Sequence, residues 1–387
     1  MTNRADRPSE QEGVLFVLDH FPRVWTSLQE LEFRLCRALH AGGLLPVVVF
    51  SEECSPELRN RFASSGAVVL AANYQHGAWA YYRLIGDLAR RYNVRTAYLD
   101  SFSFHGVMPW MVRLHGIRRI IHTNADGGVS KSRSWKRMLV TVRNAFMSWP
   151  TTLIITWSEF IRRQTIRSGV PLGKIELVYG GIDTSRFFPN PAGRAKWVER
   201  FGIPAGDLII SSIAFLKPIK RPEIVIEAGG LLAKTGIPFQ LFMAGDGPMQ
   251  SQLQARCREL GIDGRVHWLG KWSEPQALLQ ASDVFVLATV GEAFGFVVAE
   301  ALACGVPVVA ARSGAIPELV EEGRTGLLAA PNDPASFASA IERLAQDPTL
   351  RRAMAARGPQ TVRQKFTVGM TVENTIRVFE RVGLGLH

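Results

Sequence analysis

Short apolar runs alternate with helix-length segments along most of the 387 residues, and this alternation constrains the fold more than any other feature. In the first half, the runs are short and rich in β-branched residues, and they lie at residues 14–18, 46–50, 67–70, 96–99, 119–122 and 153–156. Helix-like segments separate them, for example residues 28–41 and 78–92. Short apolar strands with helices between them indicate a parallel sheet covered on both faces. The first half is therefore predicted to form a doubly wound α/β domain.

The same pattern restarts after Pro189, which predicts a second domain of the same kind. Its expected strands lie at residues 208–213, 239–243, 266–269, 284–287 and 306–310. Residues 190–200 contain Pro191 and Gly193 and have the composition of a boundary segment, and residues 368–382 form an amphipathic helical pattern. The expected domains span residues 1–188 and 189–365, followed by a C-terminal helix in residues 366–387 that packs back on the first domain. Two such domains usually bind ligands in the cleft between them, at the carboxyl ends of the strands.

Residues 291–309 are the segment that most constrains function. Glu292 and Glu300 bracket a glycine-containing turn, which opens directly into a helix-forming run and then a buried-strand pattern. A turn that opens a helix offers free backbone N–H groups and the positive end of the helix dipole to a phosphate. A carboxylate farther along the helix can accept hydrogen bonds from sugar hydroxyls. The segment favours a nucleotide-sugar ligand; the alternative is a pair of ordinary charges on a helix surface.

Composition narrows the class of protein. No apolar run reaches the roughly 20 residues of a membrane span, and the polar first 13 residues do not resemble a secretory signal. The four cysteines are scattered without metal-ligand spacing, so a reduced, cytoplasmic setting is expected. Residues 1–190 hold 24 Lys and Arg against 15 Asp and Glu, whereas the remainder holds 21 against 19. This basic first half lacks the dense clusters of nucleic-acid-binding proteins, so no nucleic-acid partner is expected.

An ordered series of short motifs in the second half resembles the retaining glycosyltransferases of family 4, also called group 1, which have the two-Rossmann GT-B fold. The series covers residues 178–183, 217–221, 244–248, 269–270, 281–283, 292–301, 305–309, 314–318 and 323–326. Each motif alone is weak, whereas the order over about 150 residues is specific. The first half resembles the family in layout only. The resemblance implies two Rossmann-like domains facing a cleft, the first binding the acceptor and the second the nucleotide-sugar.

The resemblance also implies roles for individual residues. Glu300 corresponds to the ribose-binding position, and Glu292 to the one that holds the transferred sugar near the reacting carbon. Backbone N–H groups of Phe294, Gly295, Phe296 and Val297 are expected to bind the distal phosphate and the sugar. Lys220 corresponds to the lysine that neutralises the diphosphate leaving group, and such a cation stabilises charge that develops as the glycosidic bond breaks. The base is expected near Trp272 and Glu274.

Three positions depart from the family pattern. The family usually has an arginine five residues before the lysine, where this chain has Phe215; Lys217 or Arg221 would supply the missing charge, although ammonium and guanidinium groups are not equivalent. The loop after the first strand, residues 19–25, lacks the usual glycine pair and loosely resembles a subset that acts in extracellular polysaccharide assembly.

The third departure concerns a histidine that often faces the donor sugar. The corresponding residue is Ala125, so the neighbouring His122 and Asp126 are the candidates for catalysis, and His105 is a further one. The alternatives are a core histidine at His122, a turn-forming role for Asp126 and solvation of Lys220 in its loop.

Residues 130–150 mix basic residues with tryptophan, phenylalanine and methionine. Such a segment can lie on an anionic membrane surface at the inner face of the membrane. The alternative is a helix packed on the sheet with its basic residues in solvent.

The sequence and the resemblance together predict a retaining, metal-independent hexosyltransferase. It would move a sugar from a nucleoside-diphosphate-sugar to the hydroxyl of a small-molecule, glycan or lipid-linked acceptor, for example in polysaccharide or glycolipid assembly. No cofactor or metal site is expected, since no Asp-x-Asp motif lies near the donor segment. The alternatives are a nucleotide-sugar epimerase or sugar phosphorylase on the same fold, or a partner protein that has lost catalysis.

Overall fold

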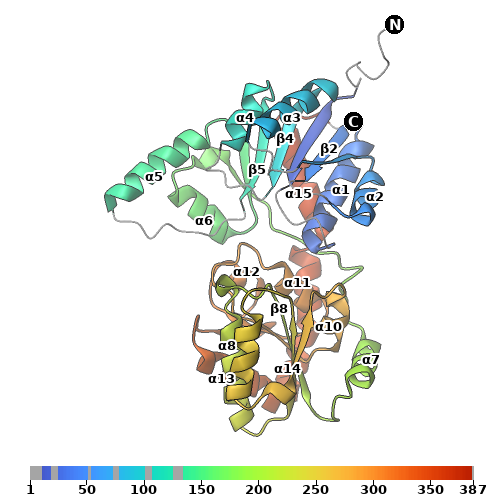
Figure 1. The fold of residues 1–387 in the computed structure, drawn as a ribbon, viewed down its shortest axis with the longest axis vertical. Coiled ribbons are helices and arrows are strands. Elements are labelled where there is room, and N and C mark those ends of the chain that lie inside the picture. Colours follow the sequence, from blue (N-terminus) through green and yellow to red (C-terminus); the bar gives the residue numbers. More distant parts are fainter. Residues whose placement is uncertain are drawn as a thin grey trace. The chain divides into compact units, whose positions relative to one another are not determined.

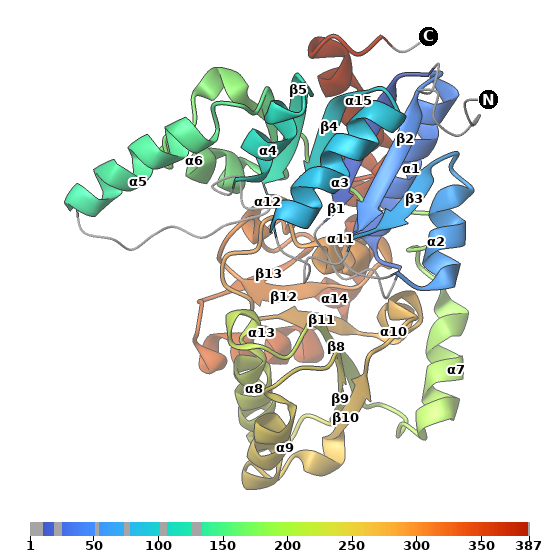
Figure 2. The same cartoon turned by 45° about the horizontal axis from the view of Figure 1, so that its top comes forward.

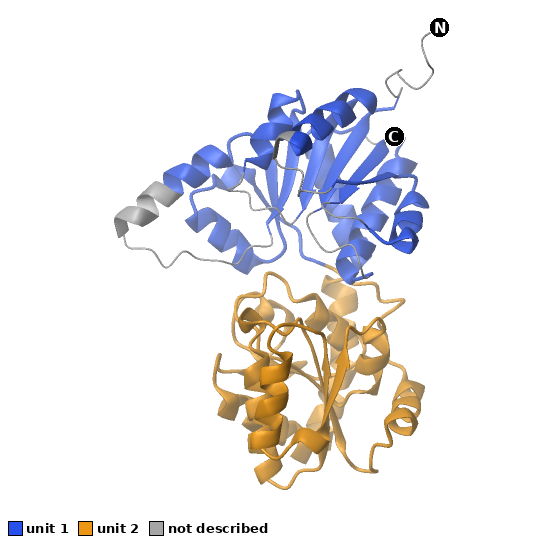
Figure 3. Ribbon diagram, in the orientation of Figure 1, with its two compact units in different colours: residues 1–180, 368–387 blue, residues 181–367 orange. Residues whose placement is uncertain are grey.

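The chain forms two compact units. The structure is a computed structural model that describes residues 11–18, 25–50, 54–72, 78–100, 107–124 and 134–385. Unit 1 comprises Met1–Gly180 and Val368–His387, and unit 2 comprises Gly181–Thr367 (Figure 3). Each unit is a parallel sheet between helices (Figures 1 and 2).

Unit 1 contains a seven-stranded parallel sheet in the order β3-β2-β1-β4-β5-β6-β7. Its strands are β1 (Gly13–Leu18), β2 (Leu45–Phe50), β3 (Val68–Ala71), β4 (Val94–Asp100), β5 (Arg119–Asn124), β6 (Leu153–Thr156) and β7 (Ile175–Leu177). Its helices are α1 (Ser27–Ala41), α2 (Pro56–Ala63), α3 (Ala78–Arg91), α4 (Met108–Leu114), α5 (Ser134–Met147), α6 (Glu159–Arg167) and α15 (Val368–Arg381). Alternate residues of β1 face opposite sides of this sheet, as the pleat requires. Phe16 packs with α1, α2 and α15, whereas Val17 packs with α3 and α4.

The C-terminal helix α15 belongs to unit 1, as predicted. Phe379 is fully buried there and stacks on Tyr98 of β4 at a centroid distance of 5.9 Å. The Thr371 hydroxyl donates a hydrogen bond to the carbonyl oxygen of Tyr179 (3.0 Å), and Arg381 forms an ion pair with Glu176 (2.5 Å). The chain therefore leaves unit 1 at residue 180 and returns to complete its core at residue 368.

Unit 2 contains a six-stranded parallel sheet in the order β10-β9-β8-β11-β12-β13. Its strands are β8 (Leu208–Ile213), β9 (Phe239–Ala244), β10 (Val266–Gly270), β11 (Val284–Leu287), β12 (Val308–Ala311) and β13 (Gly326–Ala329). Its helices are α7 (Pro191–Phe201), α8 (Pro222–Lys234), α9 (Gln250–Glu259), α10 (Pro275–Ala281), α11 (Phe296–Ala303), α12 (Ile316–Leu319), α13 (Pro334–Gln346) and α14 (Pro348–Lys365). One apolar cluster joins the sheet to α8, α9 and α13, and a second joins it to α7 and α10. Both units thus confirm the predicted doubly wound class.

Three features differ from the sequence-based expectation. The predicted boundary segment, residues 190–200, forms most of helix α7 (Pro191–Phe201) rather than a linker, because Pro191 occupies the first turn, Gly202 caps the helix with a left-handed backbone (φ 60°) and Trp197 is buried. The short strands β7 and β13 were not predicted. The units divide at 180/181 and 367/368, against expected boundaries at 188/189 and 365/366.

Residues 181–188 lie in unit 2 because their contacts are made there. The Ile182 N–H donates a hydrogen bond to the Phe366 carbonyl oxygen (3.0 Å), and the Arg186 guanidinium donates to the Gln276 side chain (3.1 Å).

None of the helices in the described ranges combines the length and the apolar character needed to cross a membrane. All four cysteines are free thiols, and burial raises the pKa of Cys257 to about 11.

The packing of α15 generates a stability prediction. Phe379→Ala removes a fully buried ring from the unit 1 core and is expected to lower the free energy of unfolding by about 3–5 kcal/mol. Glu373→Ala, at an exposed position of the same helix, is the control and should change it by less than about 0.5 kcal/mol. Urea unfolding of both variants measures the difference. Equal stabilities would show that α15 does not contribute to the core.

Candidate active site

The candidate site in unit 2 lies where the strand order reverses. The chain passes from β8 to β9 and β10 on one side and then returns to the other side of β8 as β11. The loops that leave β8 and β11 therefore start from neighbouring carboxyl ends, which is where doubly wound sheets bind their ligands. Lys217, Lys220 and Arg221 follow β8, whereas Glu292 and residues 294–297 follow β11. We call these residues, together with Glu300, the switch-point site.

A direct contact joins the two loops. The Lys220 ammonium donates a hydrogen bond to the Glu292 carboxylate, with 2.5 Å between Nζ and Oε1. The side chains are 27% and 16% exposed respectively, so solvent screens the pair only partly. The structure thus brings together two residues that the sequence assigned to the same ligand from segments 72 positions apart.

The loop after β8 presents further positive charge. Phe215 occupies the position where the family usually has arginine, and its ring is 47% exposed. The Lys217 ammonium lies 5.7 Å from the centroid of this ring. Arg221 has a left-handed backbone (φ 51°) between a short 3-10 turn and α8, and its guanidinium lies 3.5 Å from the Glu223 carboxylate. Among the described residues, Lys217 forms no ion pair with a carboxylate, whereas Arg221 forms one with Glu223.

Two glycines fix the path of this loop. A Cβ atom on Gly245 would lie 2.0 Å from the Ala214 carbonyl oxygen, and one on Gly247 would lie 2.4 Å from the Leu216 carbonyl oxygen. The Leu216 N–H also donates a hydrogen bond to the Asp246 carbonyl (2.7 Å). The loop after β9 thus supports the loop that carries Lys217 and Lys220, which gives these glycines a structural role.

The loop after β11 rests on the loop after β12. The Ala315 N–H donates to the Glu292 carbonyl (2.9 Å), and the Gly291 N–H donates to the Ser313 hydroxyl (3.2 Å). Gly314 has a positive φ of 63°, and a Cβ atom there would lie 2.5 Å from the Glu292 nitrogen. No sequence motif indicates the role of Ser313, because its hydrogen bond forms only when β11 and β12 are neighbours.

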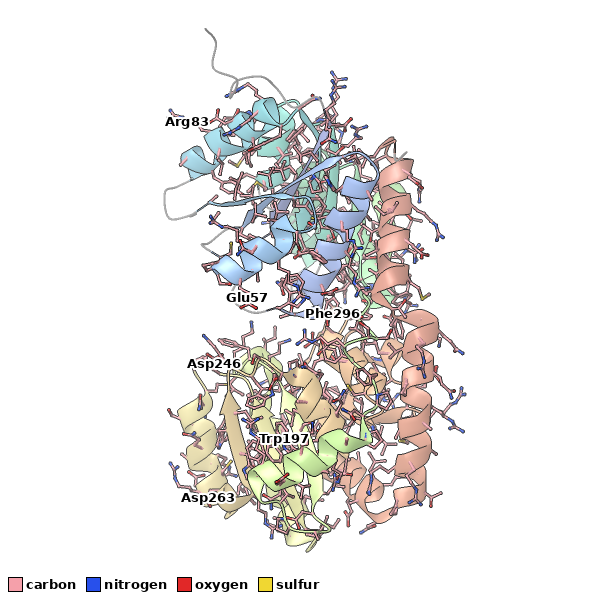
Figure 4. The ribbon with its side chains drawn as sticks, turned by 90° about the vertical axis from the view of Figure 1, so that its right-hand side faces the viewer. Glu57, Arg83, Trp197, Asp246, Asp263 and Phe296 are labelled. Carbon is pink, nitrogen blue, oxygen red and sulfur yellow. The ribbon has the colours of Figure 1, made fainter. Side chains whose placement is uncertain are left out.

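Helix α11 begins immediately after this loop. Gly295 caps it with a left-handed backbone (φ 97°), and the first N–H groups to donate inside the turn are those of Val298 and Ala299, to the Gly295 carbonyl. The N–H groups of residues 294–297 precede these bonds, in the part of a helix where N–H groups lack intrahelical acceptors and anions bind. Figure 4 labels Phe296 and Asp246 at the edge of unit 2 where β9 and β11 end, and Asp263, which precedes β10, at the opposite edge.

Glu300 lies on α11 and is 8% exposed. Burial, and then the charge of Glu300, raises the pKa of the Cys304 thiol well above its usual range. The start of α11 is anchored by Phe294, which is buried and lies 5.7 Å from the Phe366 ring and 5.1 Å from the Phe296 ring. The carboxylate and the helix N-terminus are therefore held on one rigid element.

Trp272 and Glu274 follow β10. The Trp272 indole packs against Trp197 at 5.6 Å, lies 5.1 Å from the Arg200 guanidinium and donates a hydrogen bond to the Glu274 carbonyl (2.8 Å). The Glu274 residue is exposed. Within the described part of the chain, neither residue forms a hydrogen bond, an ion pair or a ring contact with Lys220 or Glu292.

The residues of unit 1 that the sequence suggested for catalysis are either buried or outside the described ranges. His122 lies within β5 and has no exposed surface. Asp126, Ala125, His105 and residues 19–24 lie outside the described residues. Within the ranges that are described, no three His, Cys, Asp or Glu side chains form a group that could hold a metal ion.

Two family models match most of the chain. The model described as glycosyl transferases group 1 matches residues 193–361, and the model described as glycosyltransferase family 4 matches residues 33–186. Among curated proteins, the N-acetyl-α-D-glucosaminyl L-malate synthase of Bacillus anthracis is 33% identical over 196 residues, which are 51% of each chain. The GDP-mannose-dependent α-(1-6)-phosphatidylinositol monomannoside mannosyltransferase of Mycolicibacterium smegmatis is 30% identical over 71% of this chain and 72% of its own length.

The matched region spans about half the length of several curated relatives, among them the B. anthracis synthase and D-inositol 3-phosphate glycosyltransferases. Among solved structures, Anabaena HepE in complex with UDP-glucose superposes with a TM-score of 0.80 at 19% identity, over 95% of this chain and 99% of that chain. This likeness confirms the fold, and the sequence matches establish the family: the chain belongs to the group 1 glycosyltransferases, also called glycosyltransferase family 4.

Proposed function

We propose that this protein transfers a sugar from a nucleoside-diphosphate-sugar to an acceptor hydroxyl, with retention of the anomeric configuration. The observation that carries the proposal is the Lys220–Glu292 contact beside the N-terminus of α11, with Glu300 on the same helix. The site thus offers a cation and a helix N-terminus for a diphosphate. It also offers two carboxylates, one for the hydroxyl groups of the ribose and one for those of the transferred sugar. The M. smegmatis relative is named for its dependence on GDP-mannose, and HepE was solved with UDP-glucose, which supports this class of donor.

The ion pair has a defined role in this proposal. Without a bound donor, the Glu292 carboxylate pairs with the Lys220 ammonium, so the two charges compensate each other. When the diphosphate binds, the ammonium turns to the phosphate oxygens, and the Glu292 carboxylate accepts hydrogen bonds from the transferred sugar. Lys220 then stabilises the charge that develops on the leaving phosphate. Electrostatic stabilisation of this kind is the largest single contribution to the rate enhancement of many enzymes.

The proposed reaction needs no covalent intermediate. The bond between the anomeric carbon and the phosphate oxygen breaks, the acceptor oxygen bonds to that carbon from the same face, and the acceptor proton passes to the leaving phosphate. The contributions of the chain are positioning and electrostatic stabilisation. Lys220, Lys217 and the α11 N-terminus supply the positive charge in this proposal, and unit 1 supplies the acceptor site. His122 and Asp126 remain candidates for the sugar-facing role, although the buried position of His122 favours the core-histidine alternative.

The first prediction concerns nucleotide binding. UDP, GDP and ADP are tested by thermal shift, since a ligand that binds only the folded state raises the melting temperature. At least one should stabilise the wild type, and Glu300→Ala and Lys220→Ala should each weaken its binding by about 1.5–3 kcal/mol, the usual range for hydrogen bonds to charged groups. Glu342→Ala and Lys234→Ala, on other helices of unit 2, are matched controls. Equal shifts in all five proteins would refute both assignments.

The second prediction separates Glu292 from the nucleotide. Glu292→Gln keeps the size of the side chain but removes the charge, so turnover should fall by roughly 10²–10³-fold while nucleoside-diphosphate affinity stays within about threefold, a loss of under 1 kcal/mol. Initial rates with a nucleotide-sugar and calorimetric titration of the diphosphate measure the two effects. Normal turnover in this variant would contradict the role assigned to Glu292. Product formed without any acceptor would instead support the epimerase alternative.

The third prediction concerns the residue that compensates for Phe215. Lys217→Ala should weaken diphosphate binding more than Arg221→Ala, because the Arg221 charge is partly neutralised by Glu223 and the Lys217 ammonium lies over the Phe215 ring. Calorimetric titration of both variants gives the comparison. A larger loss in Arg221→Ala would assign the compensating charge to the guanidinium instead.

A further inference from the structure

The most exposed apolar side chains of the described residues lie together in unit 1. Among the described residues, the large apolar side chains with the greatest exposure are Leu114 (70%), Trp149 (69%), Val107 (61%), Phe146 (60%) and Val142 (60%). All five belong to α4, to α5 or to the residues directly beside these helices. Figures 1 and 2 show α5 projecting from the side of unit 1 that carries α4 and α6. Contiguous exposed apolar side chains usually mark an interaction surface rather than a packing accident.

Aromatic contacts join the two helices into one surface. The Trp110 ring of α4 stacks on the Phe146 ring of α5 at a centroid distance of 5.0 Å, and it lies 5.7 Å from the Trp149 ring. Val142 and Phe146 are four residues apart on α5 and therefore share a face of that helix. We call Trp110, Leu114, Val142, Phe146 and Trp149 the aromatic patch.

The turn that carries Trp149 is fixed by a lysine. The Lys174 ammonium donates hydrogen bonds to the carbonyl oxygens of Trp149 and Thr151, both at 2.9 Å, and to that of Ser148 at 3.3 Å. Burial, and then the nearby charge of Arg113, lowers the pKa of Lys174. The exposed Trp149 thus lies on a turn whose backbone is held by hydrogen bonds from Lys174, and the charges of Lys174 and Arg113 lie nearby.

Basic residues accompany the aromatic patch, and the described segments that carry it, residues 107–124 and 134–158, contain no acidic residue. Arg113 lies in the last turn of α4, Arg118 follows that helix, and Arg143 lies on α5. All three are exposed. The sequence contains no Asp or Glu in residues 107–124, 134–158 or 160–175. Lys136 and Arg137 also lie on α5, among side chains outside the described set. The surface therefore combines tryptophan and phenylalanine with arginines that form no ion pair among the described residues.

We propose that the aromatic patch docks this protein on the surface of a membrane that contains anionic phospholipids. Tryptophan favours the interface between water and hydrocarbon, and an amphipathic helix with aromatic and basic residues lies in the plane of that interface. Each arginine near an anionic surface contributes about 1 kcal/mol. A second copy of the chain suits the patch poorly, because a symmetric contact would bring two basic rims together. The proposal does not depend on the proposed activity.

The test is co-sedimentation of the full chain with vesicles of phosphatidylcholine alone or of phosphatidylcholine with phosphatidylglycerol. The wild type should bind only the anionic vesicles. Phe146→Ser combined with Trp149→Ser should lower the affinity at least tenfold, since burying one large apolar side chain contributes roughly 1.5–3 kcal/mol. Arg118→Gln combined with Arg143→Gln should lower it about 30-fold, as expected for two charges at about 1 kcal/mol each.

Control variants carry comparable changes away from the aromatic patch. Leu231→Ser removes an apolar side chain that is 36% exposed on α8, and Arg352→Gln combined with Arg357→Gln removes two exposed charges from α14. These controls should bind like the wild type, and unchanged melting temperatures should show that every variant folds. Failure of the wild type to bind anionic vesicles, or equal binding by patch and control variants, would overturn the proposal. A concentration-dependent dimer that only the patch variants lose would assign the patch to self-association instead.

Discussion

The arrangement of the switch-point site depends on the reversal of strand order beside β8. Because β9 and β11 lie on opposite sides of β8, two loops far apart in the sequence start from adjacent carboxyl ends. The Lys220–Glu292 contact is the direct consequence, and the loops after β9 and β12 support it from either side through close backbone contacts at Gly245 and Gly314. A small number of glycines with positive φ thus allows the close loop packing that holds charged side chains beside a helix N-terminus.

The candidate residues divide unequally between the two units. Unit 2 contains every donor-binding residue inferred from the resemblance, and the central ones converge at one edge of one sheet. Unit 1 would supply the acceptor site, yet its catalytic candidates are a buried histidine and residues outside the described ranges. This division follows the general rule that a fold is shared across a family whereas acceptor choice lies in the parts that vary.

Much of the fold was predictable because its signal is local. Strands of four or more residues mostly coincide with apolar runs that are bounded by turn residues. The helical spacing of apolar residues in α1, α3 and α15 is visible without tertiary information. Strand β7 escaped prediction because Ile175–Leu177 is only three residues long and places a glutamate at its centre. Helix α7 was interpreted as a linker because Pro191 and Gly193 suggest one, whereas the buried Trp197 that anchors it is recognisable only from its contacts with Phe242 and Trp272. The residues of the site were identified from the ordered motifs, but the ion pair and the support from Ser313 depend on which strands are neighbours.

The central claim is that the loops after β8 and β11 in unit 2 hold the diphosphate of an activated sugar. Hydrogen–deuterium exchange with and without the stabilising nucleoside diphosphate tests it most directly, since exchange reports the protection of individual backbone N–H groups. The account predicts slower exchange at residues 294–297 and at residues 216–221, with little change on β12 and β13. Protection confined to unit 1, or none at the N-terminus of α11, would contradict it.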